Sequence, residues 1–64
     1  MSQRTMKGLR NDMNLTQEQM AEKLEIHVST YISYENNQSR IPYKIALKFA
    51  DVVGVSNLRD IKFD

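Results

Sequence analysis

The chain has 64 residues, no cysteine, one histidine and a net charge of +1, and this length predicts a single domain over residues 1–64. The composition excludes a disulfide framework and a thiolate metal site, and it predicts no metal, no cofactor and no small-molecule ligand. The apolar residues never run together as in a signal peptide or a membrane span of about 20 residues, so we expect a cytoplasmic protein with no membrane partner.

Basic side chains gather in two stretches, near the N-terminus and after the middle of the chain, with acidic residues between them. The two groups are Arg4, Lys7 and Arg10, and Arg40, Lys44 and Lys48. This placement fits a surface that contacts nucleic acid, and it fits a solvated surface of mixed sign equally well.

The first helix is predicted from about Thr5 to Met13, where apolar residues recur at helical spacing and Asn14 offers a break. A second helix begins at a capping box, in which Thr16 is the N-cap and Gln19 returns a hydrogen bond to it. This helix spans about two turns. Its buried face consists of Met20, Ala21 and Leu24.

A short turn, Glu25-Ile26-His27, leads to a third helix from about Val28 to Asn36. Tyr31 and Tyr34 are its inward residues. The pair Asn36-Asn37 is predicted to end the helix, because asparagine tolerates the left-handed conformation that is common at helix ends.

Pro42 suits the first turn of a fourth helix, and Gly54 ends that helix. It carries the strongest amphipathic stripe in the chain, namely Ile45, Ala46, Phe49, Ala50 and Val53. A last short helix, capped by residue 56 or 57, carries Leu58 and Ile61. Five short helices and no strand predict an all-α fold.

Two short helices joined by a three-residue turn form a unit that can read DNA, in which the second helix enters the major groove and the first crosses the backbone. Because the two tyrosines turn inward, the opposite face of the third helix is expected to carry Val28, Ser29, Ile32 and Ser33. Serine hydroxyls can bond to any base edge, and apolar groups can contact a thymine methyl. An ordinary helical hairpin with a solvated face is the alternative interpretation.

The run LTQEQMAEKLEIHVSTYISYENNQSRIP, followed by KFADVVGVS, resembles the XRE-type helix-turn-helix family that includes the Cro and lambda-type repressors. The resemblance covers about Lys7 to Ile61, and its strength lies in the order and spacing of the motifs together. It implies a lambda-repressor-like fold with the helix-turn-helix at residues 16–37. It also implies a sequence-specific transcriptional regulator of the repressor type, encoded by a phage or a prokaryote, that binds double-stranded DNA.

The resemblance further assigns roles to single residues. It implies base contacts by Val28, Ser29 and Ser33, with Ile32 at the margin. It implies phosphate contacts by Gln17, His27, Asn36, Arg40 and Lys44. A phosphate beside Gln17 agrees with the partial positive charge of a helix N-terminus, although simple helix capping is its alternative role. Arg10 and Glu35 are expected to form a structural ion pair that fixes the recognition helix against the core.

Two features depart from the family pattern. Glu25 occupies the turn position often filled by glycine, which predicts a strained or altered turn. The recognition helix lacks the glutamines and arginines that make bidentate base contacts. Val28 and Ile32 therefore keep an alternative open, a protein-interaction module such as an antitoxin or coactivator component. An enzyme is not expected, because the sequence has no evident nucleophile and base pair and no Gly-rich phosphate loop.

One such domain buries little surface on a half-site, so we expect a homodimer that binds two half-sites. The apolar residues after Gly54 are its predicted contact surface, namely Val55, Leu58, Ile61 and Phe63. In the alternative interpretation, Leu58 and Ile61 cover the core of the first and fourth helices.

Overall fold

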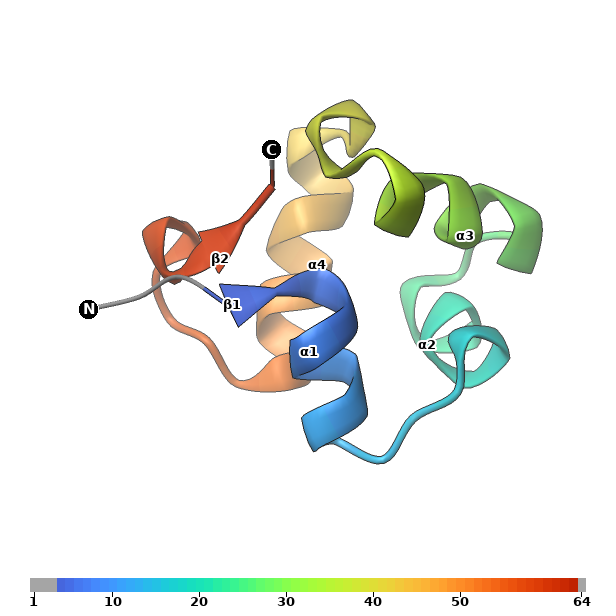
Figure 1. Ribbon diagram of the computed structural model, residues 1–64, viewed down its shortest axis with the longest axis horizontal. Coiled ribbons are helices and arrows are strands. Elements are labelled where there is room, and N and C mark those ends of the chain that lie inside the picture. Colours follow the sequence, from blue (N-terminus) through green and yellow to red (C-terminus); the bar gives the residue numbers. More distant parts are fainter. Residues whose placement is uncertain (1–3, 64) are drawn as a thin grey trace.

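A computed structural model describes residues 4–63 (Figure 1). The ends of the predicted domain, residues 1–3 and 64, lie outside the described residues. In chain order the elements are β1 (Arg4–Thr5), α1 (Met6–Asp12), α2 (Gln17–Leu24), α3 (Val28–Asn36), the 3-10 turn η1 (Gln38–Arg40), α4 (Tyr43–Val53), the 3-10 turn η2 (Leu58–Asp60) and β2 (Ile61–Lys62). Helices dominate the described part of the chain, which confirms the predicted all-α class.

Local hydrogen bonds explain where the first two helices begin. At the start of α1, the Thr5 hydroxyl accepts a hydrogen bond from the Gly8 N–H at 3.0 Å. At α2 the predicted capping box is present in both directions. The Thr16 hydroxyl accepts from the Gln19 N–H, and the Gln19 Oε1 accepts from the Thr16 N–H. These bonds satisfy backbone donors that a helix N-terminus otherwise leaves unpaired.

Residues in the left-handed conformation turn the chain after three of the helices. Asn14 follows α1 with φ 58°, Glu25 ends α2 with φ 60°, and Gly54 ends α4 with φ 75°. The end of α3 at Asn36 is confirmed, but the expected left-handed residue there is wrong. Asn37 has φ −142° and ψ 86°, and η1 begins at the next residue.

Two short strands join the ends of the described chain, and the prediction of no strand is therefore wrong. β1 and β2 pair in parallel, with Arg4 opposite Ile61. Strands of two residues are too short to show a period in the sequence. Ile61 of β2 and Met6, directly after β1, are both buried. The predicted fifth helix is reduced to η2, and Ile61 lies beyond it in β2.

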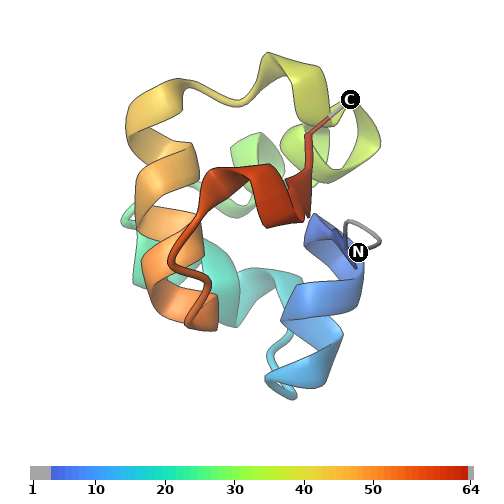
Figure 2. The same ribbon diagram turned by 90° about the vertical axis from the view of Figure 1, so that its left-hand side faces the viewer.

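One buried cluster connects all four α-helices and β2. In Figure 1, α1 and α4 lie at the centre, α2 and α3 lie on one side of them, and β1 and β2 lie on the other. Figure 2 shows the segment with η2 and β2 lying across the space between α4 and α1. The buried members are Met6, Leu9, Met20, Ala21, Leu24, Tyr31, Phe49, Ala50 and Ile61. This cluster fixes α2 and α3 relative to the rest of the chain.

Candidate nucleic-acid interface

The turn between α2 and α3 is held by backbone hydrogen bonds around Glu25. The Glu25 N–H donates to the Glu22 carbonyl, and the Ile26 N–H donates to the Ala21 carbonyl at 3.0 Å. This closure requires a left-handed residue at position 25, where a side chain with a Cβ is strained. The structure thus places a glutamate in the conformation that favours glycine, which is the strain expected from the sequence.

Small and aromatic side chains set the contact between the two helices. Ala21 is buried in α2, and Tyr31 is fully buried in α3. Tyr34 is half-buried and packs against the same cluster, as does Ile26 from the turn. The inner face of α3 therefore carries its tyrosines, and the opposite face is left for solvent or a ligand.

The outer face of α3 presents two of the four expected base-contacting residues freely. Ser29 and Ser33 are exposed, and Ile32 is half-buried. Val28 is also half-buried and packs against the core cluster. The exposed polar part of this face consists mainly of the two serine hydroxyls, and Val28 contributes less surface than a fully outward residue would.

Both serine hydroxyls already have local partners. The Ser33 hydroxyl donates to the Thr30 carbonyl at 2.9 Å, so its lone pairs remain for an incoming donor. The Ser29 hydroxyl lies 2.9 Å from Nδ1 of His27, and the same nitrogen accepts from the Ser29 N–H at 3.3 Å. His27 is thus the N-cap of α3.

A buried ion pair lies between α1 and the C-terminal end of α3. Arg10 Nε donates to Glu35 Oε2 at 2.7 Å, and the two side chains are 9% and 5% exposed. A second guanidinium N–H group, Nη1, donates to the Leu15 carbonyl at 2.8 Å. The Tyr31 hydroxyl also donates to Glu35 Oε2. The C-terminal end of α3 is therefore tied to α1 and to the loop before α2.

Gln17 joins the same cluster from the first position of α2. Its carboxamide nitrogen donates to Glu35 Oε1 at 3.0 Å, and the residue is half-buried. Neither this contact nor that of Tyr31 with Glu35 was predicted from the sequence. The second contact spans four positions within one helix, which is a spacing that could have indicated it. The contact of Gln17 spans 18 positions and left no local signal.

The cluster shifts the pKa of each ionisable group in it. Burial disfavours the charged form of Glu35, but hydrogen bonds from Arg10, Tyr31 and Gln17 outweigh this effect and lower its pKa. Hydrogen bonding to Glu35 raises the pKa of Arg10. Burial, and then the hydrogen bond to Glu35, raises the pKa of Tyr31. At neutral pH the cluster therefore consists of a carboxylate, a guanidinium and a neutral phenol.

The other expected phosphate-contacting residues are exposed along one continuous stretch of chain. Asn36 ends α3, Arg40 lies in η1 and Lys44 lies in the first turn of α4. Figure 1 shows this stretch leading from α3 over to the start of α4. The structure thus places an amide at the end of α3 and two cations on the chain that follows it.

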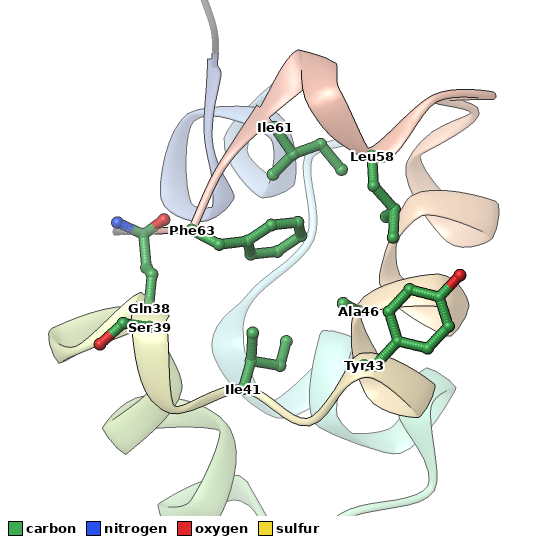
Figure 3. A pocket seen from close by; sticks show the side chains of 8 residues that line it. All are labelled: Gln38, Ser39, Ile41, Tyr43, Ala46, Leu58, Ile61 and Phe63. Carbon is green, nitrogen blue, oxygen red and sulfur yellow. The ribbon is translucent and has the colours of Figure 1, made fainter.

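A shallow apolar groove of about 400 Å³ lies beside the C-terminal segment (Figure 3). Its lining residues are Gln38, Ser39, Ile41, Tyr43, Ala46, Leu58, Ile61 and Phe63. Leu58 and Phe63 are half-buried, whereas Ile61 is only 2% exposed and belongs to the core. Of the residues expected to contact a second copy, Ile61 is therefore the one that the fold itself buries.

Neither a metal site nor a membrane-spanning helix is found within residues 4–63. No group of three or more His, Cys, Asp or Glu side chains is placed to hold a metal ion there. None of the helices in this range has both the length and the apolar character that crossing a membrane demands.

The family model described as Helix-turn-helix matches residues 6–56, which is most of the chain. The chain therefore belongs to this helix-turn-helix family, the XRE type related to lambda repressor and Cro. The family is one of DNA-binding regulators rather than enzymes, and α2 and α3 are the helices of its DNA-binding motif in this chain. No curated protein and no solved structure shows a significant match.

Proposed function

We propose that this protein is a transcriptional repressor that binds operator DNA with α3 in the major groove. The observation that carries the proposal is the exposed outer face of α3, with Ser29 and Ser33 free of the core while the other side of the helix is anchored by Tyr31 and Glu35. A rigidly held helix with one free polar face is what base reading in a groove requires.

The phosphate contacts of the proposal surround this face. Gln17 and His27 lie at the N-terminal ends of α2 and α3. Asn36 is the last residue of α3, and Arg40 and Lys44 follow it in η1 and in the first turn of α4. Phosphate contacts at the N-termini of α2 and α3, and from the end of α3 to the start of α4, would fix the position of α3 on the DNA. The serines of α3 would then supply the sequence-dependent contacts.

The exposed surface of α3 favours DNA over a protein partner. A protein-interaction module would present apolar side chains on this helix, but Val28 packs against the core and leaves Ile32 as the main apolar residue on the outer face. Recognition by two hydroxyl groups and one aliphatic group suits a target site with thymine methyls.

Selection of binding sites from random duplex DNA tests the proposal. We expect enrichment of an inverted repeat whose half-site centres lie about 34 Å apart. Folded protein that enriches no motif at low salt would overturn the proposal.

Two substitutions separate base contacts from phosphate contacts. Ser33→Ala is expected to change the selected sequence at one position in each half-site. Lys44→Ala is expected to weaken binding to all sequences and to reduce the salt dependence of binding by about one phosphate contact. If both variants weakened every sequence equally, the assignment of Ser33 to base reading would be wrong.

We also propose that the protein acts as a homodimer through the groove region. The half-buried side chains Val55, Leu58 and Phe63 lie at or near the groove, and Tyr43 at its edge is 71% exposed. Ile61 is excluded from this surface by its burial. An aromatic residue beside an apolar groove is a typical anchor of a protein interface.

Sedimentation over a range of concentrations tests the dimer. Tyr43→Ser and Phe63→Ser are expected to shift the equilibrium toward the monomer. Leu47→Ser is the matched control, because Leu47 is an exposed apolar residue of α4 that does not line the groove. A wild-type protein that binds its site as a monomer would contradict the dimer.

A further inference from the structure

The carboxylate of Glu35 accepts hydrogen bonds from three different helices. Its Oε2 accepts from Arg10 Nε and from the Tyr31 hydroxyl. Its Oε1 accepts from Gln17 Nε2 at 3.0 Å and, over 3.4 Å, from Arg10 Nη2. A carboxylate offers about four lone-pair sites, so this one is saturated. The carboxylate therefore acts as a common acceptor that links α1, α2 and α3.

An ionised carboxylate fixes the orientation of the Gln17 carboxamide. Glu35 can only accept hydrogen bonds, so the amide must turn its nitrogen, and not its oxygen, toward the core. One N–H of the amide is used in this contact, and the second N–H remains available at the start of α2. A mobile glutamine side chain loses conformational entropy when it binds a phosphate. A glutamine that is already held in position does not pay this entropic cost on binding.

The other glutamines of the described chain are held in the opposite way. Gln19 uses its Oε1 to accept from the Thr16 N–H, and Gln38 uses its Oε1 to accept from the Met6 N–H. Both accept from a backbone N–H at or just before the start of a helix, across 3 positions for Gln19 and 32 positions for Gln38. Gln17 differs because its nitrogen contacts a buried charge, which is not a capping arrangement.

We propose that Glu35 is a positioning residue for DNA binding, which holds the Gln17 carboxamide ready for a phosphate and couples this contact to the Tyr31 hydroxyl through one shared carboxylate. The inference rests on the proposed function, since it takes the phosphate contact of Gln17 from it. It goes beyond the structural ion pair, because it gives Glu35 an effect on the affinity for DNA that passes through Gln17.

Tyr31→Phe is the variant of choice for the test. Replacing Glu35 or Arg10 would leave a buried charge unpaired, and such a protein can fail to fold. Tyr31→Phe removes only the hydroxyl that orients Glu35 and keeps the ring in the core. Tyr34→Phe is the matched control, since the Tyr34 hydroxyl makes no hydrogen bond within residues 4–63.

The first measurement is the nuclear magnetic resonance spectrum of the side-chain amides in the free protein. We expect one Gln17 amide proton to exchange with solvent more slowly than those of Gln19 and Gln38, and its signal to move in Tyr31→Phe but not in Tyr34→Phe. Gln17 protons that exchange as fast as those of the other two glutamines, or that ignore the loss of the Tyr31 hydroxyl, would overturn the inference.

The second measurement is a double-mutant cycle on affinity for DNA. Tyr31→Phe should weaken binding by about threefold to tenfold when Gln17 is present and have no effect when Gln17 is replaced by methionine. Equal weakening in both backgrounds would reduce Glu35 to a purely structural role and overturn the inference, while the proposed function would stand. Wild-type protein that binds no DNA would overturn the proposed function and the phosphate contact together, and the amide spectra would still decide whether Glu35 holds Gln17.

Discussion

Two opposite charges, on Arg10 and Glu35, are almost fully buried in this 64-residue chain. Burial of an ion costs several kcal/mol, and attraction within the pair offsets this cost only when the remaining polar atoms also have partners. Leu15, Tyr31 and Gln17 supply those partners. Among the described residues, no buried side-chain nitrogen or oxygen lacks a hydrogen bond. The contribution of the ion pair to stability therefore depends on the hydrogen bonds that its neighbours make to it.

Removal of one charge should be far worse than removal of both. Arg10→Met leaves the Glu35 carboxylate buried without its cation, and we expect a loss of about 3 to 5 kcal/mol in the free energy of unfolding. That loss approaches the total stability of about 5 kcal/mol at the lower end for small domains. The double variant Arg10→Met with Glu35→Leu should recover part of it. Urea unfolding of the single and double variants measures both values, and losses that simply add would contradict the coupling.

Acid should weaken the same cluster through Glu35. Its pKa in the folded state lies below the ordinary value of 4.5, so the unfolded state binds more protons as the pH falls below that value. The stabilisation is present above about pH 4.5 and is lost as the pH falls through the folded pKa. Melting temperatures of the wild type should therefore drop as the pH falls below about 4.5.

Glu35→Gln is the control for this acid transition. We expect it to be less stable than the wild type at neutral pH, because Arg10 loses its counter-charge, and to show a shallower decline in acid. A decline as steep as that of the wild type would assign the transition to other carboxylates.

Sequence reasoning reached this cluster only in part. The pairing of Arg10 with Glu35 followed from a family resemblance, since 25 positions separate the two residues and no local pattern links them. The contact of Gln17 with Glu35 could not be predicted at all, because it depends on how α2 and α3 cross. Phosphate contact by Gln17 and base contact by Ser29 and Ser33 remain predictions.

At the scale of the elements, local sequence rules predict some helix ends and not others. The capping box at Thr16, the start of α3 at Val28 and the end of α4 at Gly54 follow from residue types in a fixed order, and the structure has all three. The conformation of Asn37, with φ −142°, does not follow, because the 3-10 turn η1 begins at the next residue. The two strands depend on tertiary packing and are equally invisible to local rules.

Glu25→Gly should stabilise the turn between α2 and α3. Glu25 has φ 60°, and a residue with a side chain in this conformation costs about 1 to 2 kcal/mol. Glycine avoids this strain, but its larger entropy in the unfolded chain offsets part of the gain. The variant also loses the ion pair with Lys48 at 3.2 Å, which is exposed and contributes little. We expect a net gain of about 0.5 to 1 kcal/mol in the free energy of unfolding, measured by urea unfolding.

Glu25→Ala separates strain from charge, because it loses the ion pair with Lys48 and keeps a Cβ at positive φ. It should be less stable than both the wild type and Glu25→Gly. A glycine variant no more stable than the alanine variant would show that the turn is unstrained.

At the scale of the whole molecule, the C-terminal segment divides between two tasks. β2 pairs with β1 and buries Ile61 against the core, which ties the end of the described chain to its beginning. Two residues further on, Phe63 is half-buried and lines the groove. The apolar residues in this segment looked alike in the sequence, because a strand of two residues gives no period that separates inward from outward positions. The fold assigns Ile61 to stability and leaves Phe63 for a partner.

Substitution of these two residues should therefore separate folding from association. Ile61→Ala creates a cavity in the core, and we expect it to lower the free energy of unfolding by about 2 to 4 kcal/mol. Phe63→Ser should cost less stability but should weaken the homodimer. Urea unfolding at a protein concentration low enough to keep the chain monomeric measures the first effect without the contribution of the dimer. Sedimentation equilibrium measures the second. If Phe63→Ser cost more stability than Ile61→Ala and left association unchanged, Phe63 would belong to the core and the dimer contact would lie elsewhere.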